Sequence, residues 1–95
     1  MAIDCEWRMT ELQVLLAMET LSVALVSGSP VVFSLEGEGE QYVRCKLDSI
    51  EVSLYADGFD LQGEGLDVRY EPDDIRSPAG AVALLSGELR AALAR

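Results

Sequence analysis

The segment Val31–Tyr70, VVFSLEGEGEQYVRCKLDSIEVSLYADGFDLQGEGLDVRY, decides the fold because its apolar residues recur at every second position. This alternation is typical of β-strands that bury one face. It predicts strands over residues 31–36, 41–47, 50–55, 59–62 and 66–70. Asp57-Gly58 is a strong hairpin signal, since a type I′ turn requires positive φ at both central residues. We therefore expect an antiparallel β-meander of four to five strands.

Asp48-Ser49 leaves one alternative open within this meander. The pair is either a tight turn between two strands or a bulge inside one long strand. The choice affects a short internal similarity, since the segments Leu35–Gly39 and Leu61–Gly65 resemble each other at a spacing of 26 residues. A bulge would put both Gly-Glu-Gly loops at one end of the sheet, whereas a turn would put them at opposite ends. We attribute this similarity to shared turn chemistry in preference to duplication of a sequence segment.

The C-terminal segment has the pattern of an amphipathic helix. Ser77 supplies a cap, and Pro78 suits the first helical position. One apolar face is formed by Val82, Leu85, Leu89, Ala92 and Leu93. We expect a helix over residues 78–94 that packs on one face of the sheet.

The segment Thr10–Ser27 is also predicted to be a helix, because Thr10 is a good cap while Gly28 and Pro30 form a stop signal. One of its faces is apolar and consists of Val14, Ala17, Met18, Leu21 and Leu25. Further apolar residues populate the rest, so this helix must be covered on more than one side. The alternative is a split segment, in which residues 21–25 form a strand and residues 27–30 a hairpin turn.

These elements predict an α+β fold: an N-terminal helix, the antiparallel meander and a C-terminal helix. The length of 95 residues allows a single compact domain over residues 1–95. At the N-terminus, Ile3, Cys5, Trp7 and Met9 alternate with polar residues, which is typical of a short edge strand joining the sheet. Core packing is the preferred role for Trp7, and a dimer contact is the second.

The charge of the chain excludes several classes of partner. Seventeen Asp and Glu stand against seven Lys and Arg with no His, a formal charge of −10. Such a surface repels phosphate backbones and anionic lipids, so we expect no direct contact with nucleic acid. The longest apolar run, Val14–Met18, is too short to span a bilayer. The N-terminus carries acidic residues where a secretion signal has basic ones, which predicts a cytoplasmic protein. In that compartment we expect Cys5 and Cys45 to be reduced, buried thiols and not a disulfide.

The residue types also argue against catalysis. Without His there is no His-based general base, nucleophile-activating group or metal ligand. The Gly-Glu-Gly loops place a carboxylate where a phosphate would bind. The acids near Asp57 and Asp60 do not follow a calcium-loop layout, and a solvated acidic surface is the plain interpretation. We therefore expect no enzyme activity, no cofactor and no metal.

The acidic residues are concentrated in the predicted sheet and its loops. Residues 36–74 contain twelve Asp and Glu and three Lys and Arg, a net charge of −9. Such a surface is either a solubility device or an electrostatic docking face for a basic partner protein. The candidate partner-binding residues are Glu36, Glu38, Glu40, Tyr42, Asp57, Asp60, Glu64, Asp67 and Glu71.

Two functional hypotheses follow from these patterns. The first is a non-catalytic acidic protein-binding module that occupies a basic surface of a partner, such as a nucleic-acid-binding protein. Small acidic inhibitors, including bacterial immunity proteins and phage-encoded anti-defence proteins, are similar in size and charge, although no motif supports membership. The alternative is a structural subunit or homo-oligomer that associates through the apolar segment Thr10–Ser27.

Overall fold

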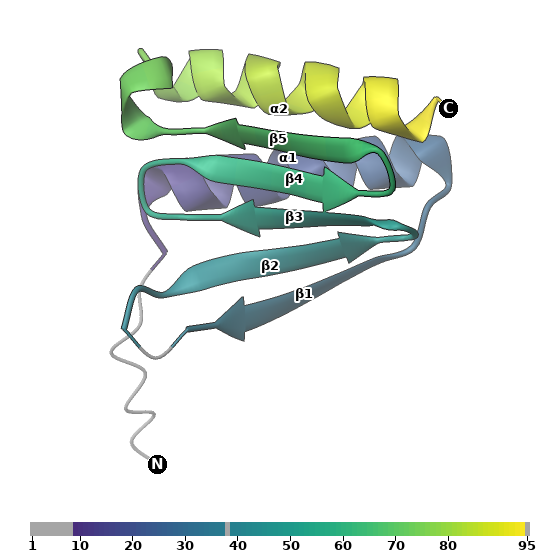
Figure 1. Ribbon diagram of the computed structural model, residues 1–95, viewed down its shortest axis with the longest axis horizontal. Coiled ribbons are helices and arrows are strands. Elements are labelled where there is room, and N and C mark those ends of the chain that lie inside the picture. The colour runs from purple at the N-terminus through teal and green to yellow at the C-terminus, as the bar shows by residue number, and fades with distance from the viewer. Residues whose placement is uncertain (1–8, 38, 95) are drawn as a thin grey trace.

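The computed structural model describes residues 9–37 and 39–94 of the chain. Its elements are α1 (Glu11–Ser27), β1 (Val31–Glu36), β2 (Tyr42–Leu47), β3 (Ile50–Leu54), β4 (Phe59–Gly63), β5 (Leu66–Tyr70), a 3-10 turn (Pro72–Asp74) and α2 (Pro78–Leu93). The predicted α+β fold is confirmed (Figure 1). In sequence order, α1 precedes the five-stranded antiparallel sheet and α2 follows it. The predicted strand through Trp7, together with Cys5, lies outside the described residues.

The sheet is a simple meander in the order β1-β2-β3-β4-β5. Leu47 of β2 lies opposite Ile50 of β3, and Asp48 between them has a φ of 51°. Asp48-Ser49 is therefore a turn, so the bulge alternative is wrong. As a consequence, the β1–β2 and β4–β5 loops lie at opposite ends of the sheet.

The β3–β4 connection differs from the predicted type I′ turn. Neither Asp57 nor Gly58 has a positive φ, and the connection spans residues 55–58, where the Tyr55 N–H donates to the Gly58 carbonyl oxygen at 2.8 Å. Gly58 is required for another reason: a Cβ at this position would lie 2.7 Å from the Tyr70 carbonyl oxygen. The hairpin signal thus located the turn correctly but gave the wrong turn type.

α1 is a single helix, and the helix-plus-strand alternative is wrong. At its N-terminus the Gln13 N–H donates to Thr10 Oγ1 at 3.2 Å, and the Thr10 N–H donates to Gln13 Oε1 at 2.9 Å. This reciprocal arrangement is a capping box. At its C-terminus Gly28 adopts the left-handed conformation with φ 69°, which a glycine accepts without strain.

α2 begins where the sequence predicts. Ser77 Oγ accepts a hydrogen bond from the Gly80 N–H at 3.0 Å, and Pro78 takes the first helical position. The two helices contact each other extensively. Figure 1 shows α1 behind the sheet and α2 alongside β5. Of the strands, α1 makes most of its contacts with β2 and β3. Within residues 9–37 and 39–94, no helix therefore lies over the β1 side of the sheet.

The core lies between the sheet and the two helices. Every second residue of β2 and β3 is buried and belongs to one core cluster with Leu16 and Val23 of α1 and Leu85 and Leu89 of α2. The buried apolar residues are Leu16, Val23, Ala24, Val43, Cys45, Leu47, Ile50, Val52, Leu54, Phe59, Leu61, Ala81, Leu85 and Leu89. Neither described helix is long and apolar enough to cross a membrane.

Candidate functional site

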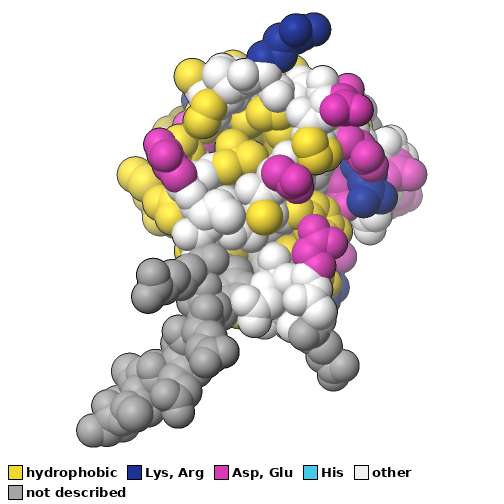
Figure 2. All heavy atoms as spheres, turned by 90° about the vertical axis from the view of Figure 1, so that its left-hand side faces the viewer, with side chains coloured by type: hydrophobic (Ala, Val, Ile, Leu, Met, Phe, Trp, Pro, Cys, Tyr) yellow, Lys and Arg dark blue, Asp and Glu magenta, His cyan; other side chains and the backbone are white. Residues whose placement is uncertain are grey.

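Three of the predicted acidic residues meet at one end of the sheet. Glu40 from the β1–β2 loop, Asp57 from the β3–β4 loop and Glu71 after β5 line an open hollow of about 170 Å³. Its other lining residues are Tyr55, Gly58, Arg69, Tyr70 and Pro72. We call this feature the acidic hollow. Figure 2 shows this end of the molecule, where Asp and Glu side chains are more frequent than Lys and Arg.

Among the described residues that line the acidic hollow, Arg69 is the one basic side chain. Arg69 Nε lies 3.2 Å from Glu71 Oε1, and both side chains are exposed. Such an exposed ion pair contributes little to stability and is screened by salt. Among the described residues, no group of His, Cys, Asp and Glu is arranged to hold a metal ion. The arrangement is suited to receiving a guanidinium or ammonium group from outside.

Two tyrosines stand beside this hollow on the outer side of the sheet. The rings of Tyr42 and Tyr55 lie 5.2 Å apart between centroids. The Tyr55 hydroxyl donates to Asp60 Oδ2 at 3.3 Å, and Asp60 is only 6% exposed. Burial, and secondarily the Asp60 charge, raises the pKa of Tyr55. Asp60 is therefore largely buried and accepts a hydrogen bond within the sheet.

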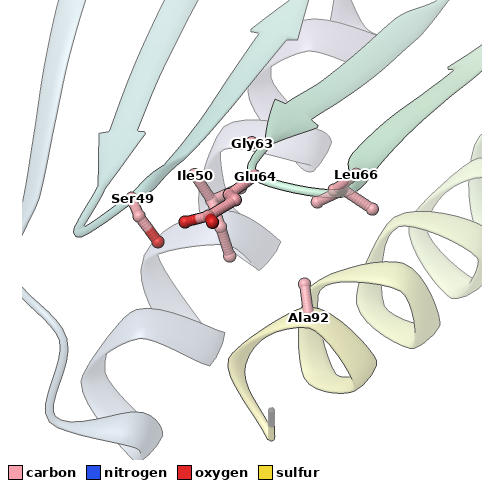
Figure 3. Close-up of a pocket in the computed structure, with 6 residues that line it drawn as sticks. All are labelled: Ser49, Ile50, Gly63, Glu64, Leu66 and Ala92. Carbon is pink, nitrogen blue, oxygen red and sulfur yellow. The ribbon is translucent and has the colours of Figure 1, made fainter.

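The other candidate residues are dispersed. Glu36 pairs with Arg44 at 3.5 Å, and Arg44 also pairs with Glu51. Asp67 lies on β5 opposite Gln62. Glu64 is in the β4–β5 turn at the far end, where it lines a separate hollow with Ser49 and Ile50 (Figure 3). Glu38 lies outside the described residues.

The outer face of the strands carries both signs of charge. The strand register aligns Arg44, Ser53, Asp60 and Arg69 in one row across the sheet. A second row contains Lys46, Glu51, Gln62 and Asp67. Acids and bases are therefore neighbours on the strands, and the acidic excess of this segment comes mainly from the loops at both ends.

A second surface is apolar, and sequence reasoning recognised only half of it. All the large hydrophobic residues exposed in the described part of the chain belong to α1 and β1. They are Val14, Met18, Leu21, Leu25 and Val26 on α1 and Val32, Phe33 and Leu35 on β1. We call this set without Val32 the apolar face, because Val32 lies opposite Lys46 and points to the other side of the sheet from Phe33 and Leu35. Met18 is 62% exposed and Leu35 is 57% exposed, so these side chains are far from core burial.

The apolar face is hollowed between α1 and β1. The described residues that line this groove of about 280 Å³ are all apolar: Met9, Ala17, Met18, Leu21, Phe33, Leu35 and Val43. Phe33 lies opposite Cys45 and Leu35 lies opposite Val43. Because residues directly opposite in an antiparallel pair share a face, Phe33 and Leu35 point to the side of the sheet that the helices cover. They stay exposed because α1 lies closer to β2 and β3 than to β1.

In the part of the chain that the structure describes, β1 is also an edge strand with no element paired to its outer side. Its only charged residue is Glu36 at the last position, and it contains neither Lys nor Pro. The opposite edge strand, β5, carries Asp67 and Arg69 and runs beside α2 (Figure 1). Edge strands are normally blunted by charges, prolines or covering elements. A long apolar edge such as β1 is a ready site for contact with another chain.

A sequence signal for this half of the surface existed in β1. Val31, Val32, Phe33 and Leu35 place apolar residues on both sides of one strand, whereas a half-buried strand alternates strictly. On α1, the predicted apolar face of Val14, Met18, Leu21 and Leu25 is the part that the structure leaves exposed. No protein-family model, no curated protein and no solved structure matches this chain, so its surfaces are the guide to its function.

Proposed function

We propose that this chain is a non-catalytic protein-binding module whose apolar face receives an apolar helix. The observation that carries the proposal is the gathering of all large exposed hydrophobic residues of the described chain on α1 and β1. Soluble monomers rarely expose contiguous apolar patches beyond a few hundred Å². Burying such surface stabilises a complex by about 25 cal/mol per Å² before the costs of association.

The spacing of the exposed α1 residues favours a helix as the bound element. Val14, Met18, Leu21 and Leu25 are separated by four, three and four residues. This spacing aligns them in one stripe on the helix surface and is the pattern of helix–helix seams. Phe33 and Leu35 form the floor of the groove beside this stripe. A helix lying in the groove would contact α1 on its flank and β1 beneath it.

Photo-cross-linking in the native host tests this proposal. A benzophenone amino acid is placed at position 18, which lines the groove of the apolar face, and at position 83 as a matched control. Both positions are exposed and helical, but Ala83 is on α2. We expect a protein adduct from position 18 and none from position 83, with the adduct mapping to a helical segment. Equal labelling from both positions, or none from position 18, would contradict the proposal.

The acidic hollow supports a second candidate function, which is binding to a basic surface of a partner protein. The partner would be a protein such as a nucleic-acid-binding protein, and this chain would act as an acidic inhibitor of it. The described lining of the hollow has three carboxylates and one arginine, so the local field favours a cationic side chain. Such contacts speed association and select the partner more than they add affinity. Bound in this way, the module would compete with the natural anionic ligand of the partner.

An oligoarginine peptide serves as a probe for this second function. The double variant Asp57→Asn, Glu71→Gln removes two charges from the hollow, and Asp48→Asn, Glu64→Gln removes two charges from the opposite end. We expect the first variant to weaken binding of the probe by about tenfold or more at low salt and the second to have a much smaller effect. Equal losses for the two variants would show that only net charge is recognised.

A further inference from the structure

We infer that the helix received by the apolar face is α1 of a second copy of this chain, so that the protein forms a symmetric dimer. This inference rests on the proposed function and names its partner. In a two-fold symmetric dimer the same surface patch of each copy contacts that of the other. The patch must therefore contain both a protruding element and a groove that accepts it. The apolar face does so, because α1 offers a stripe of four apolar residues and the groove between α1 and β1 accepts one.

The composition of α1 supports this occupant. Its inner side packs on the sheet through Leu16 and Val23, while Met18, Leu25 and Val26 remain exposed. A helix that is apolar around most of its circumference requires cover on more than one side. The sheet and α2 of the same chain provide part of this cover. The α1 stripe and β1 of a second copy would provide the rest.

The distribution of charge points to the same partner. Two copies that each carry a formal charge of −10 repel each other, so their contact must avoid the acidic regions. α1 contains only Glu11 and Glu19 as charged residues, and β1 contains only Glu36. Residues 36–74 hold a net charge of −9, and their loops lie at the ends of the sheet. A basic partner would be drawn to the acidic hollow, whereas an equally acidic copy is best accommodated on the apolar face.

Sedimentation of the full-length chain over a wide concentration range tests the dimer. We expect the mass to approach twice that of one chain as concentration rises. Met18→Glu and Leu21→Glu each place a charge in the contact and should weaken association by roughly a hundredfold or more. Ala83→Glu and Ala91→Glu are the controls, since they add the same charge at exposed α2 positions and should leave association nearly unchanged. A chain that stays monomeric, or a dimer insensitive to both apolar-face variants, would overturn the inference.

Cross-linking from position 18 in a mixture of isotopically light and heavy copies identifies the occupant. Adducts between light and heavy chains that map to α1 or β1 support the dimer. Adducts to a different protein from the host would overturn the dimer but leave the proposed function standing. Adducts to residues 1–8 of the same chain would overturn both, because the groove would then be covered from within. Met9, which lines the groove, is the residue that directly follows that segment.

Discussion

Gln13 is the polar side chain that ties α1 to the sheet. It is 2% exposed, its amide Nε2 donates to the Leu54 carbonyl oxygen at 3.0 Å, and its Oε1 accepts the Thr10 N–H. One residue therefore completes the helix cap and satisfies a carbonyl of β3. Sequence reasoning found the cap residue Thr10, but the link to Leu54 depends on how the helix lies over the sheet.

Replacing Gln13 should lower stability clearly. Gln13→Ala removes half of the capping box and leaves the buried Leu54 carbonyl oxygen without this donor, so we expect the free energy of unfolding to fall by about 2–3 kcal/mol. Urea denaturation measures the change. Gln41→Ala, in the exposed β1–β2 loop, is the control and should change the free energy by less than about 0.5 kcal/mol. A similar loss in both variants would show that the Gln13 contacts do not stabilise the fold.

The buried thiol of Cys45 makes the free energy of unfolding depend on pH in the alkaline range. Its thiol is fully buried, and burial raises the pKa of Cys45 from 9.0 to about 12. The unfolded chain therefore loses this proton first, and the stabilising effect of burying the neutral thiol is complete below pH 9 and is lost as pH rises toward 12. Between these values the free energy of unfolding should fall by up to about 1.4 kcal/mol per pH unit.

The variant Cys45→Ala isolates this contribution. It should start less stable because the side chain is removed from the core, yet its stability should fall less steeply above pH 9 than that of the wild type. The comparison of slopes cancels the titration of groups present in both proteins, including Tyr55 and Tyr70 with their raised pKa values. Parallel pH profiles for the two proteins would contradict a buried neutral thiol at this position.

At the scale of elements, two helical glycines should respond to alanine in opposite directions. Gly87 lies within α2, has open space around its Cβ position and has no positive φ. Gly28 ends α1 with a φ of +69°. Gly87→Ala should stabilise the protein by about 1 kcal/mol, because alanine is the better helix former. Gly28→Ala should destabilise it by about 1 kcal/mol, because the left-handed conformation strains a side chain. Thermal unfolding measures both, and a shift of the same sign would contradict the assigned helix ends.

α1 and β1 show how far element prediction reaches. Thr10, Gly28 and Pro30 are local signals, and they placed α1 within a residue of its observed ends. The strict alternation in β2 and β3 likewise predicted two buried strands. Exposure of Phe33 and Leu35 had no such local cause, because it follows from the position of α1 over β2 and β3. The exposed apolar residues of α1 were therefore predictable, whereas in β1 the sequence indicated only the additional apolar residue Val32 and not the exposure of Phe33 and Leu35.

At the scale of the whole molecule, the placement of the acidic residues depends on the number of turns between them. Because Asp48-Ser49 is a turn, Glu64 lies at the opposite end from Glu40, Asp57 and Glu71. The sequence predicted that the acids are concentrated in residues 36–74, but not which of them meet. Neighbouring charges of opposite sign on the strands leave the loops as the main carriers of the excess.

The molecule therefore separates its two surfaces. The apolar face occupies α1 and β1, whereas the acidic hollow is built from loops at one end of the sheet. This separation allows a second copy to bind α1 and β1 while a basic partner approaches the acidic hollow. We expect a second copy of the chain to cover the apolar face in solution.

The accessibility of the Met18 methyl group tests this claim most directly. Met18 is 62% exposed in a single chain and lines the groove of the apolar face. Its methyl signal in NMR spectra is followed with a soluble paramagnetic agent as protein concentration rises, with Ala83 on α2 as the exposed reference. We predict that Met18 becomes protected at high concentration while Ala83 stays accessible. A Met18 methyl group that remains as accessible as Ala83 at every concentration would contradict the account.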